Sequence, residues 1–390
     1  MTSYEKALDG FEPVSATPIS DDELMARIAA LQGRMAARGL KAVWLDASSS
    51  LRYYTGLSIA PSERMHGAII PVRGAPVYVS PRFEVPKLDT MLRIPGDVLA
   101  WEEHEDPRAM IAARVRGLDL PGQGLALDPA TPFLFAAGMI AAMEGAVEPA
   151  APLITAQRQV KSPAEIAILR TAMEASWRVQ KAVWEGLRPG ISTAEVCQFV
   201  DAAHRRLGMK PLFVAAQFGE ATAYPHGKPG GQVLREGDMV LIDLGGILQG
   251  YRSDITRSYV FGKPTERQAY LWDCERRAHL AAFAAARPGA PCAAVDAAAR
   301  AVLEAEGFGP DYAVPGLPHR TGHGLGLDIH EDPFIVRGNA TPLEPGMVFS
   351  IEPMLCVYGE CGVRLEDIVW MGEDGPHWFC PPAQSPAAPF

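Results

Sequence analysis

The sequence predicts a two-domain α+β protein whose N-terminal half is an α/β domain. The chain has 390 residues, which is longer than a domain built around a single ordinary hydrophobic core, so its length favours two domains. Hydrophobic residues make up 48% and charged residues 21% of the chain, the balance of a globular protein with ample apolar side chain to bury. Helical and strand patterns alternate in the first half, whereas the second half combines strongly capped helices with short β-rich segments.

The N-terminal half begins with a helix. Ser20 and Glu23 have the spacing of a capping box, and the run DELMARIAALQGRMAARGL behind them has helical periodicity and stops at Gly39. The apolar runs KAVWLD, GAIIPV, APVYVS and VLAWEE then predict strands. This alternation predicts an α/β domain with a mixed sheet.

The domain boundary is expected near the Pro- and Ala-rich run VEPAAPL, residues 147–153. This run lacks clear periodicity, which is typical of a connecting segment. We therefore assign residues 1–157 to the N-terminal α/β domain and residues 158–390 to the C-terminal domain.

Helices and strands of the C-terminal half are predicted from local signals. Ser162 opens a helix with proline at the first helical position and a capping-box glutamate, and Ser192 repeats the capping box. Further helices are expected to begin at Thr265 and near Pro291. The segments VLIDLGG, SDITRSYVFG, GMVFSIEPML and GVRLEDIVWM predict strands. Helices around curved antiparallel strands make an α+β domain.

Charge and cysteine content exclude several classes of protein. The net charge of −10, with no basic run, gives no support for nucleic-acid binding. The start MTSYEKALDGFEPVS does not resemble a signal peptide, and no segment has the uninterrupted apolar length of a membrane span. The six cysteines include no CxxC pair, which argues against a disulfide framework or a zinc finger. We expect a cytoplasmic protein with neither nucleic-acid nor membrane partners.

The stretch Pro318–Pro333, PHRTGHGLGLDIHEDP, is a candidate functional site because it gathers histidines and carboxylates around alternate glycines. Glycines allow close backbone approach, which suits a crowded polar site. Alone, the stretch is ambiguous, since a glycine-rich run also cradles phosphate and a histidine is often a satisfied core residue.

Carboxylates embedded in apolar β segments on both sides of this stretch resolve the ambiguity. Asp243 ends one apolar run, and Asp254 follows after a glycine-containing stretch of hairpin length. Glu352 and Glu366 likewise follow apolar runs. A buried carboxylate is costly unless it is paired or binds a metal, so four such acids with His323 indicate a cation. For any single acid, pairing with an arginine competes with this interpretation; the candidates are Arg252, Arg257 and Arg364.

Four carboxylates and one imidazole form a hard, oxygen-rich donor set. Such a set is able to hold two divalent ions bridged by carboxylates. It suits manganese, with cobalt, iron or zinc as alternatives by affinity, and differs from the thiolate-rich set of a structural zinc site. The chemistry that follows is hydrolysis, because two ions about 3.5–4 Å apart lower the pKa of a bridging water and polarise a carbonyl.

The stretch His319–Glu331 resembles the signature of proline dipeptidases and aminopeptidase P, within the pita-bread metallopeptidases that also include methionine aminopeptidase and creatinase. The resemblance is strong over residues from about 160 to 372, and a weaker one through Leu51–Gly56 is similar to a creatinase-type N-terminal domain. It implies a pita-bread catalytic domain preceded by that α/β domain. The residues that match the family's five metal ligands, in order, are Asp243, Asp254, His323, Glu352 and Glu366.

The resemblance also implies individual roles. Asp254 and Glu366 would bridge the two ions, and Glu352 would pass a proton from the bridging water to the leaving nitrogen. His226 and His330 match the family's substrate-binding histidines, with His330 steadying the oxyanion. Arg364 is expected to touch substrate or to orient a ligand carboxylate, and His319 to lie in a supporting shell or a loop. The resemblance further implies a homodimer, with one subunit's N-terminal domain near the other's active site.

The function that the resemblance favours is a manganese-dependent Xaa-Pro dipeptidase acting on short proline-containing peptides. Alternatives are aminopeptidase P, a metal-dependent hydrolase or lyase of a small non-peptide compound, and a non-catalytic binding module. One departure concerns substrate: many prolidases have an arginine after the His-Glu-x-Pro segment, which helps to hold the C-terminal carboxylate, but Phe334 follows Pro333 here. Either Arg337, Arg364, an N-terminal-domain residue or the partner subunit supplies the charge, or the substrate lacks a free carboxylate.

Overall fold

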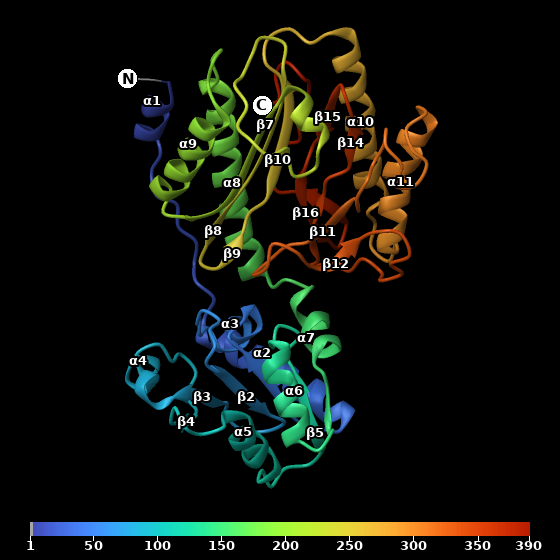
Figure 1. The fold of residues 1–390 in the computed structure, drawn as a ribbon. Coiled ribbons are helices and arrows are strands. Elements are labelled where there is room, and N and C mark those ends of the chain that lie inside the picture. The colour runs from blue at the N-terminus through green and yellow to red at the C-terminus, as the bar shows by residue number, and fades with distance from the viewer. Residues whose placement is uncertain (1–2) are drawn as a thin grey trace. The chain divides into compact units, whose positions relative to one another are not determined.

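The structure is a computed structural model that describes residues 3–390 of the chain. It contains two compact units, one formed by Ile19–Arg158 and the other by the segment that ends at Pro18 together with Gln159–Phe390 (Figure 1). The N-terminal segment therefore belongs to the same unit as the C-terminal half, which no pattern in the sequence indicated. The assignment of residues 1–157 and 158–390 as separate domains stays a prediction.

The Ile19–Arg158 unit is built on one mixed sheet with the strand order β4-β3-β2-β1-β5-β6. Its β1 pairs antiparallel with β2 and parallel with β5, so the mixed sheet predicted from the sequence is confirmed. The strands are β1 (Leu40–Asp46), β2 (Gly67–Pro71), β3 (Val77–Pro81), β4 (Asp97–Trp101), β5 (Gln123–Leu127) and β6 (Val147–Pro149). The helices are α2 (Asp21–Arg38), α3 (Ser49–Thr55), η1 (Arg82–Glu84), α4 (Val85–Asp89), α5 (Pro107–Arg116), α6 (Phe133–Ala142) and α7 (Ala151–Arg158).

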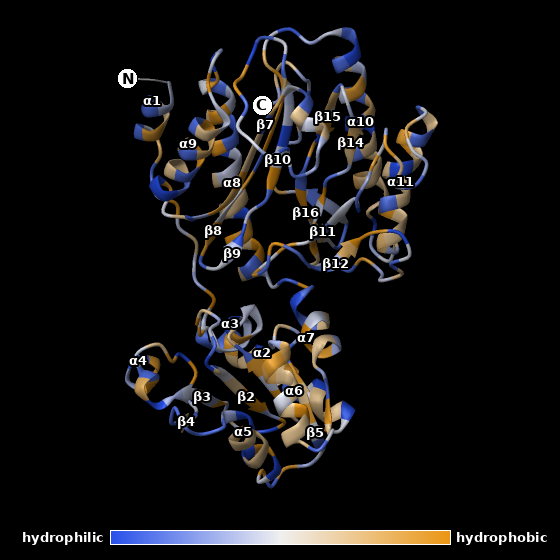
Figure 2. Cartoon of the chain, in the orientation of Figure 1, coloured by the Kyte–Doolittle hydropathy of each residue, from blue (hydrophilic) through white to orange (hydrophobic). Residues whose placement is uncertain are grey.

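Helix α6 is apolar nearly throughout, as its colouring in Figure 2 shows. Phe135 and Met139 are buried in the core of this unit. Phe133 and Leu134, however, are 84% and 70% exposed. The helix therefore presents apolar side chains outward as well as inward.

The larger unit contains three antiparallel sheets. Their strand orders are β10-β8-β7 with β9 on β8, β12-β11-β13-β16-β17, and β14-β15. The first sheet uses β7 (Lys210–Phe218), β8 (Met239–Leu248), β9 (Tyr251–Arg252) and β10 (Ile255–Val260). The others use β11 (Gly322–Gly324), β12 (Glu331–Ile335), β13 (Val348–Ile351), β14 (Met354–Val357), β15 (Cys361–Arg364), β16 (Asp367–Gly372) and β17 (Gly375–Trp378).

Helices cover these sheets, with α8 (Pro163–Gly186) and α9 (Thr193–Arg206) on one side and α10 (Glu266–Ala285) and α11 (Cys292–Ala305) on the other (Figure 1). A short η2 (Gly219–Ala223) follows β7. The predicted capping boxes at Ser162 and Ser192 are both present, and Thr265 caps α10 in the same way. Gln180 of α8 donates to the backbone carbonyl groups of Ile242 and Ile255 at 2.7 and 3.0 Å, which ties the helix to the β8–β10 sheet.

Helix α1 (Ser3–Asp9) packs against α8 and α9. The ring of Tyr4 stacks on Phe199 with 4.0 Å between centroids, and its hydroxyl donates to the carbonyl of Val183 at 3.3 Å. Glycine is required at position 186, because a Cβ atom there would lie 2.1 Å from the Tyr4 ring. The contact therefore joins segments that are far apart in sequence.

None of the helices in residues 3–390 combines the length and the apolar composition that a membrane crossing requires.

Candidate metal centre

Asp243 and Asp254 come from one β hairpin, as the sequence predicts. Strand β8 pairs antiparallel with β10, and the turn between them uses Gln249 and Gly250 at φ angles of 51° and 91°. The register places Thr256, rather than Asp254, directly opposite Asp243. Asp254 lies within the returning arm, between β9 and β10, so a carboxylate and a hydroxyl meet on the strands with a second carboxylate beside them.

The other two predicted acids lie at breaks between strands and not within them. The segment GMVFSIEPML forms β13 and β14, with Glu352 between them, where Pro353 has no N–H group to continue a ladder. The segment GVRLEDIVWM forms β15 and β16, with Glu366 between them. The Glu366 backbone N–H instead donates to the Thr256 carbonyl at 3.1 Å. These breaks bring the acids to the edge of the β8–β10 hairpin.

Thr256 orients Glu366. Its hydroxyl donates to Oε2 of Glu366 at 2.6 Å, and both residues are buried. Thr256 was not among the predicted site residues, although the polar run Thr256–Ser258 inside a strand was an available signal. Because an oriented carboxylate loses less freedom on binding a cation, this hydrogen bond from Thr256 would strengthen cation binding by Glu366.

His323 presents one ring nitrogen to the acids. Its Nδ1 lies 3.0 Å from the Gly324 carbonyl, which only accepts, so Nδ1 donates there and Nε2 is the ring nitrogen directed at the acids. Nε2 lies 3.6 Å from Oδ2 of Asp254 and 3.1 Å from Oε1 of Glu352. Ser350 fixes both partners, since its hydroxyl accepts from the His323 N–H at 2.9 Å and donates to Glu352 at 3.2 Å.

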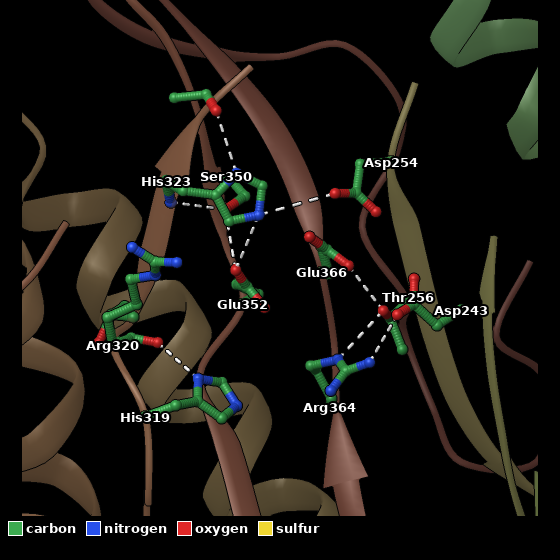
Figure 3. Close-up of polar contacts among 12 residues, drawn as sticks. Asp243, Asp254, Thr256, His319, Arg320, His323, Ser350, Glu352, Arg364 and Glu366 are labelled. Carbon is green, nitrogen blue, oxygen red and sulfur yellow. Dashed lines mark hydrogen bonds and ion pairs between the residues drawn. The ribbon is translucent and has the colours of Figure 1, made fainter. Parts of the chain in front are cut away.

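The ligand atoms of Asp254, His323 and Glu366 lie within 4.8 Å of one another, and all three residues are buried (Figure 3). Burial, and then the neighbouring carboxylates, raise the pKa of Asp254 and of Glu366 well above the ordinary range. Burial would also raise the pKa of Glu352, but the hydrogen bond and charge of His323 lower it to about 2. The acids therefore repel one another in a buried space.

A divalent cation fits this donor set. It would offset the repulsion among the carboxylates, which is the main reason after burial for their raised pKa values. Asp243 also has a buried Oδ1 atom without a hydrogen-bond partner among the described residues. A buried, unsatisfied carboxylate oxygen beside three further acids is the arrangement that a metal ion completes.

Arg364 binds Asp243 and is committed to the protein on all sides. Its Nη2 donates to Oδ2 of Asp243 at 2.7 Å, its Nε to the Thr256 hydroxyl at 3.2 Å and its Nη1 to the Pro225 carbonyl at 3.1 Å. The geometry matches the orienting role that the sequence analysis considered. Its contact with substrate stays a prediction.

The other two arginines considered as partners for the acids pair elsewhere. Arg252 pairs with Asp328 at 3.0 Å, and Arg257 pairs with Asp367 at 2.6 Å. The Arg257 guanidinium also donates to the backbone carbonyl of Glu366 at 2.9 Å, so the Arg257–Asp367 pair lies directly behind that acid. This buried pair was not predicted from the sequence, because Arg257 and Asp367 are 110 positions apart and no local pattern links them.

The predicted substrate histidines lie at the exposed side of the site. The His330 ring packs edge-on against His323, with 4.3 Å between centroids. Partial burial lowers the pKa of His330, the electrostatic effects of His323 and Arg320 lower it further, and Glu352 opposes them. His226 is exposed in the loop after η2. Both histidines are therefore near the acids and open to solvent, and their substrate contacts stay a prediction.

His319 is more enclosed than the sequence suggested. Its Nδ1 donates to the Arg320 carbonyl at 2.6 Å, and its Nε2 is buried without a hydrogen-bond partner among residues 3–390. Burial lowers its pKa, so the ring is neutral at neutral pH. His319 is thus held next to the site as an uncharged group (Figure 3).

Comparisons with known proteins agree with this geometry. Residues 167–373 match metallopeptidase family M24, and residues 27–160 match the creatinase/prolidase N-terminal domain. The chain is 37% identical to the probable dipeptidase PepE of Mycobacterium tuberculosis over 360 residues, 91% of this chain and 94% of the relative. The solved dipeptidase PepE from Mycobacterium ulcerans has a TM-score of 0.87 at 33% identity, covering 95% of this chain and 99% of that one. A prolidase from Thermococcus sibiricus has a TM-score of 0.82 at 30% identity, covering 92% and 96%.

Proposed function

Since the chain belongs to metallopeptidase family M24, with the pita-bread fold and a creatinase-type N-terminal domain, we propose that it is a dinuclear-metal Xaa-Pro dipeptidase. Membership of the family makes it a metallopeptidase that uses divalent metal ions. The observation that carries the finer proposal is the buried cluster of Asp254, His323 and Glu366, with Asp243 and Glu352 alongside. Relatives named dipeptidase and prolidase support the choice of substrate.

Two divalent ions would be held by the predicted five residues, and when bound they would lower the pKa of a shared water and polarise the scissile carbonyl. We propose manganese, because carboxylate oxygens dominate the donor set; cobalt, zinc and iron are the alternatives. The ligands are Asp243, Asp254, His323, Glu352 and Glu366.

Glu352 is the proposed proton carrier. Its carboxylate borders the cluster and is held in place by Ser350 and His323. Having accepted the proton from water, Glu352 would pass it to the proline nitrogen that leaves. His330 and His226 would hydrogen-bond the substrate on the exposed side, with His330 steadying the developing oxyanion.

The proposal includes a cytoplasmic homodimer. All six cysteines are free thiols, as expected in a reducing compartment. The apolar side chains that α6 exposes, led by Phe133 and Leu134, are of the kind that a subunit interface covers. Light scattering on the purified protein tests the dimer, and the monomer mass at micromolar concentration would contradict it.

The test of function measures proline release from Xaa-Pro dipeptides and Xaa-Pro-Yaa tripeptides, with chelator-stripped protein before and after manganese is restored. We expect manganese-dependent cleavage of the dipeptides. Preference for tripeptides would assign the chain to aminopeptidase P instead. If two ions bind and none of these peptides is cleaved, the metal centre stands, the dipeptidase proposal fails, and small non-peptide compounds are the substrates to test next.

A further inference from the structure

Arg320 stacks on Phe334, the residue that stands where many prolidases have an arginine. The Cζ atom of Arg320 lies 4.5 Å from the centroid of the Phe334 ring. Both side chains are half-buried. Stacking holds a guanidinium in one plane and leaves the N–H groups at its edge free to bind a ligand. The phenylalanine, in strand β12, thus acts as a platform for an arginine from the loop before β11.

The Arg320 guanidinium has no ion pair or hydrogen bond with any residue in 3–390, the part of the chain that the structure describes. This separates it from the arginines near it in the fold. Those four are paired with carboxylates: Arg252 with Asp328, Arg300 with Asp296, Arg337 with Asp311 and Arg364 with Asp243. Among these arginines around the metal centre, Arg320 is therefore the one whose guanidinium N–H groups are available to an anionic ligand.

The position of Arg320 is at the substrate side of the metal centre. It lies in sequence between His319 and His323, and its charge acts on His330, whose ring contacts His323. Figure 3 shows its side chain beside His323 and Glu352, whereas Asp243 and Arg364 lie across the site. A substrate that reaches from the metal ligands past His330 therefore meets this cation.

The arginines proposed from the sequence are less suitable. Arg337 is exposed, forms an ion pair with Asp311 and lies over Tyr312. Arg364 is 4% exposed and donates to Asp243, Thr256 and Pro225. Each of these two arginines already has a carboxylate partner within the protein.

We propose that Arg320, stacked on Phe334, binds the free C-terminal carboxylate of a dipeptide substrate. This inference rests on the proposed dipeptidase function but does not depend on proline being the second residue. In a dipeptide the carboxylate is one residue beyond the scissile bond, at a fixed distance from the metal centre. A planar guanidinium binds it with two parallel hydrogen bonds, which a terminal amide or a longer peptide does not reproduce. Arg320 would therefore select dipeptides over longer chains.

The test compares matched substrates, an Xaa-Pro dipeptide and its C-terminal amide, and the same pair with alanine in place of proline. In the Arg320→Met variant we expect the ratio of kcat/KM for the acid to that for the amide to fall about 30-fold or more, mainly through KM for the acid. Arg320→Lys should give a smaller fall, because an ammonium keeps the charge without the bidentate geometry. Phe334→Leu should also lower the ratio, by loosening the guanidinium.

Arg337→Met is the matched control, since it removes a neighbouring arginine that is already paired; its acid-to-amide ratio should equal that of the wild type. Equal losses on acid and amide in Arg320→Met, with normal thermal unfolding and manganese content, would overturn the proposal. The wild-type data separate the two proposals. If the wild type cleaves the alanine substrates and not the proline substrates, prolyl specificity is contradicted, and the alanine acid and amide still test Arg320. If the wild type cleaves acid and amide equally, only the proposed role of Arg320 is overturned.

Discussion

The guanidinium of Arg364 donates to Oδ2 of Asp243 at 2.7 Å, with both side chains largely buried beside the predicted metal ligands. Because this contact fixes the orientation of a ligand carboxylate, Arg364→Met should weaken manganese affinity about 10–100-fold. Titration calorimetry on the chelator-stripped protein measures this directly. Unchanged affinity would show that Asp243 needs no orienting partner, and Arg337→Met serves as a control for loss of an arginine.

Asp254→Asn should abolish hydrolysis and lower metal content together. Asp254 is buried at the junction of the cluster, and an amide offers one neutral oxygen in place of a shared carboxylate. Elemental analysis and peptidase assays on the same preparation give the answer. Full activity with normal metal content would refute the assignment of the metal centre.

The buried Arg257–Asp367 pair should make a large contribution to stability. Its side chains are 0% and 1% exposed, so Asp367→Leu leaves an uncompensated charge and should lower the free energy of unfolding by about 3–5 kcal/mol. Urea unfolding measures the loss. The double replacement Arg257→Met with Asp367→Leu leaves no unpaired charge and should cost less than Asp367→Leu alone; a larger, additive cost would contradict this account.

His204 should make the protein less stable in acid. Its Nδ1 donates to the Val200 carbonyl and its Nε2 accepts from Ser176, each at 3.0 Å. Burial lowers the pKa of His204 from 6.5 to about 4, against the opposing effects of the Val200 hydrogen bond and Asp201. The unfolded state therefore binds the proton first as pH falls, so stability is complete above about pH 6.5 and declines by up to about 3 kcal/mol toward pH 4.

The corresponding measurement is urea unfolding at pH 7.5 and pH 4.5 for the wild type and His204→Gln. Other groups titrate over the same range, so the quantity of interest is the difference between the two proteins. The variant should lose less stability on acidification than the wild type. An identical loss in both would show that His204 does not contribute.

Local chemistry explains which parts of the fold were predictable. The capping boxes at Ser162 and Ser192 depend on residues three positions apart, so the sequence displays both partners at once. The four acids stood out because each follows an apolar run, and burial of a bare carboxylate has a cost that a pattern reveals.

What the sequence did not show depends on register and on distant partners. Asp243 lies opposite Thr256 because of where the hairpin turns, and Thr256 then bonds Glu366 from another sheet. The contact of Arg320 with Phe334 joins the loop before β11 to strand β12, and no local pattern encodes that approach. Arg257 looked like a partner for the predicted acids, but its real partner is Asp367.

The stacking of Tyr4 on Phe199 has a consequence for how this enzyme is divided or engineered. The unit that carries the metal ligands is discontinuous along the chain, so Ile19–Arg158 is topologically an insertion within it. A fragment starting at Gln159 would leave the α8–α9 surface uncovered and Gly186 facing an empty slot. A minimal catalytic fragment should therefore keep the first eighteen residues and replace the inserted unit with a short linker.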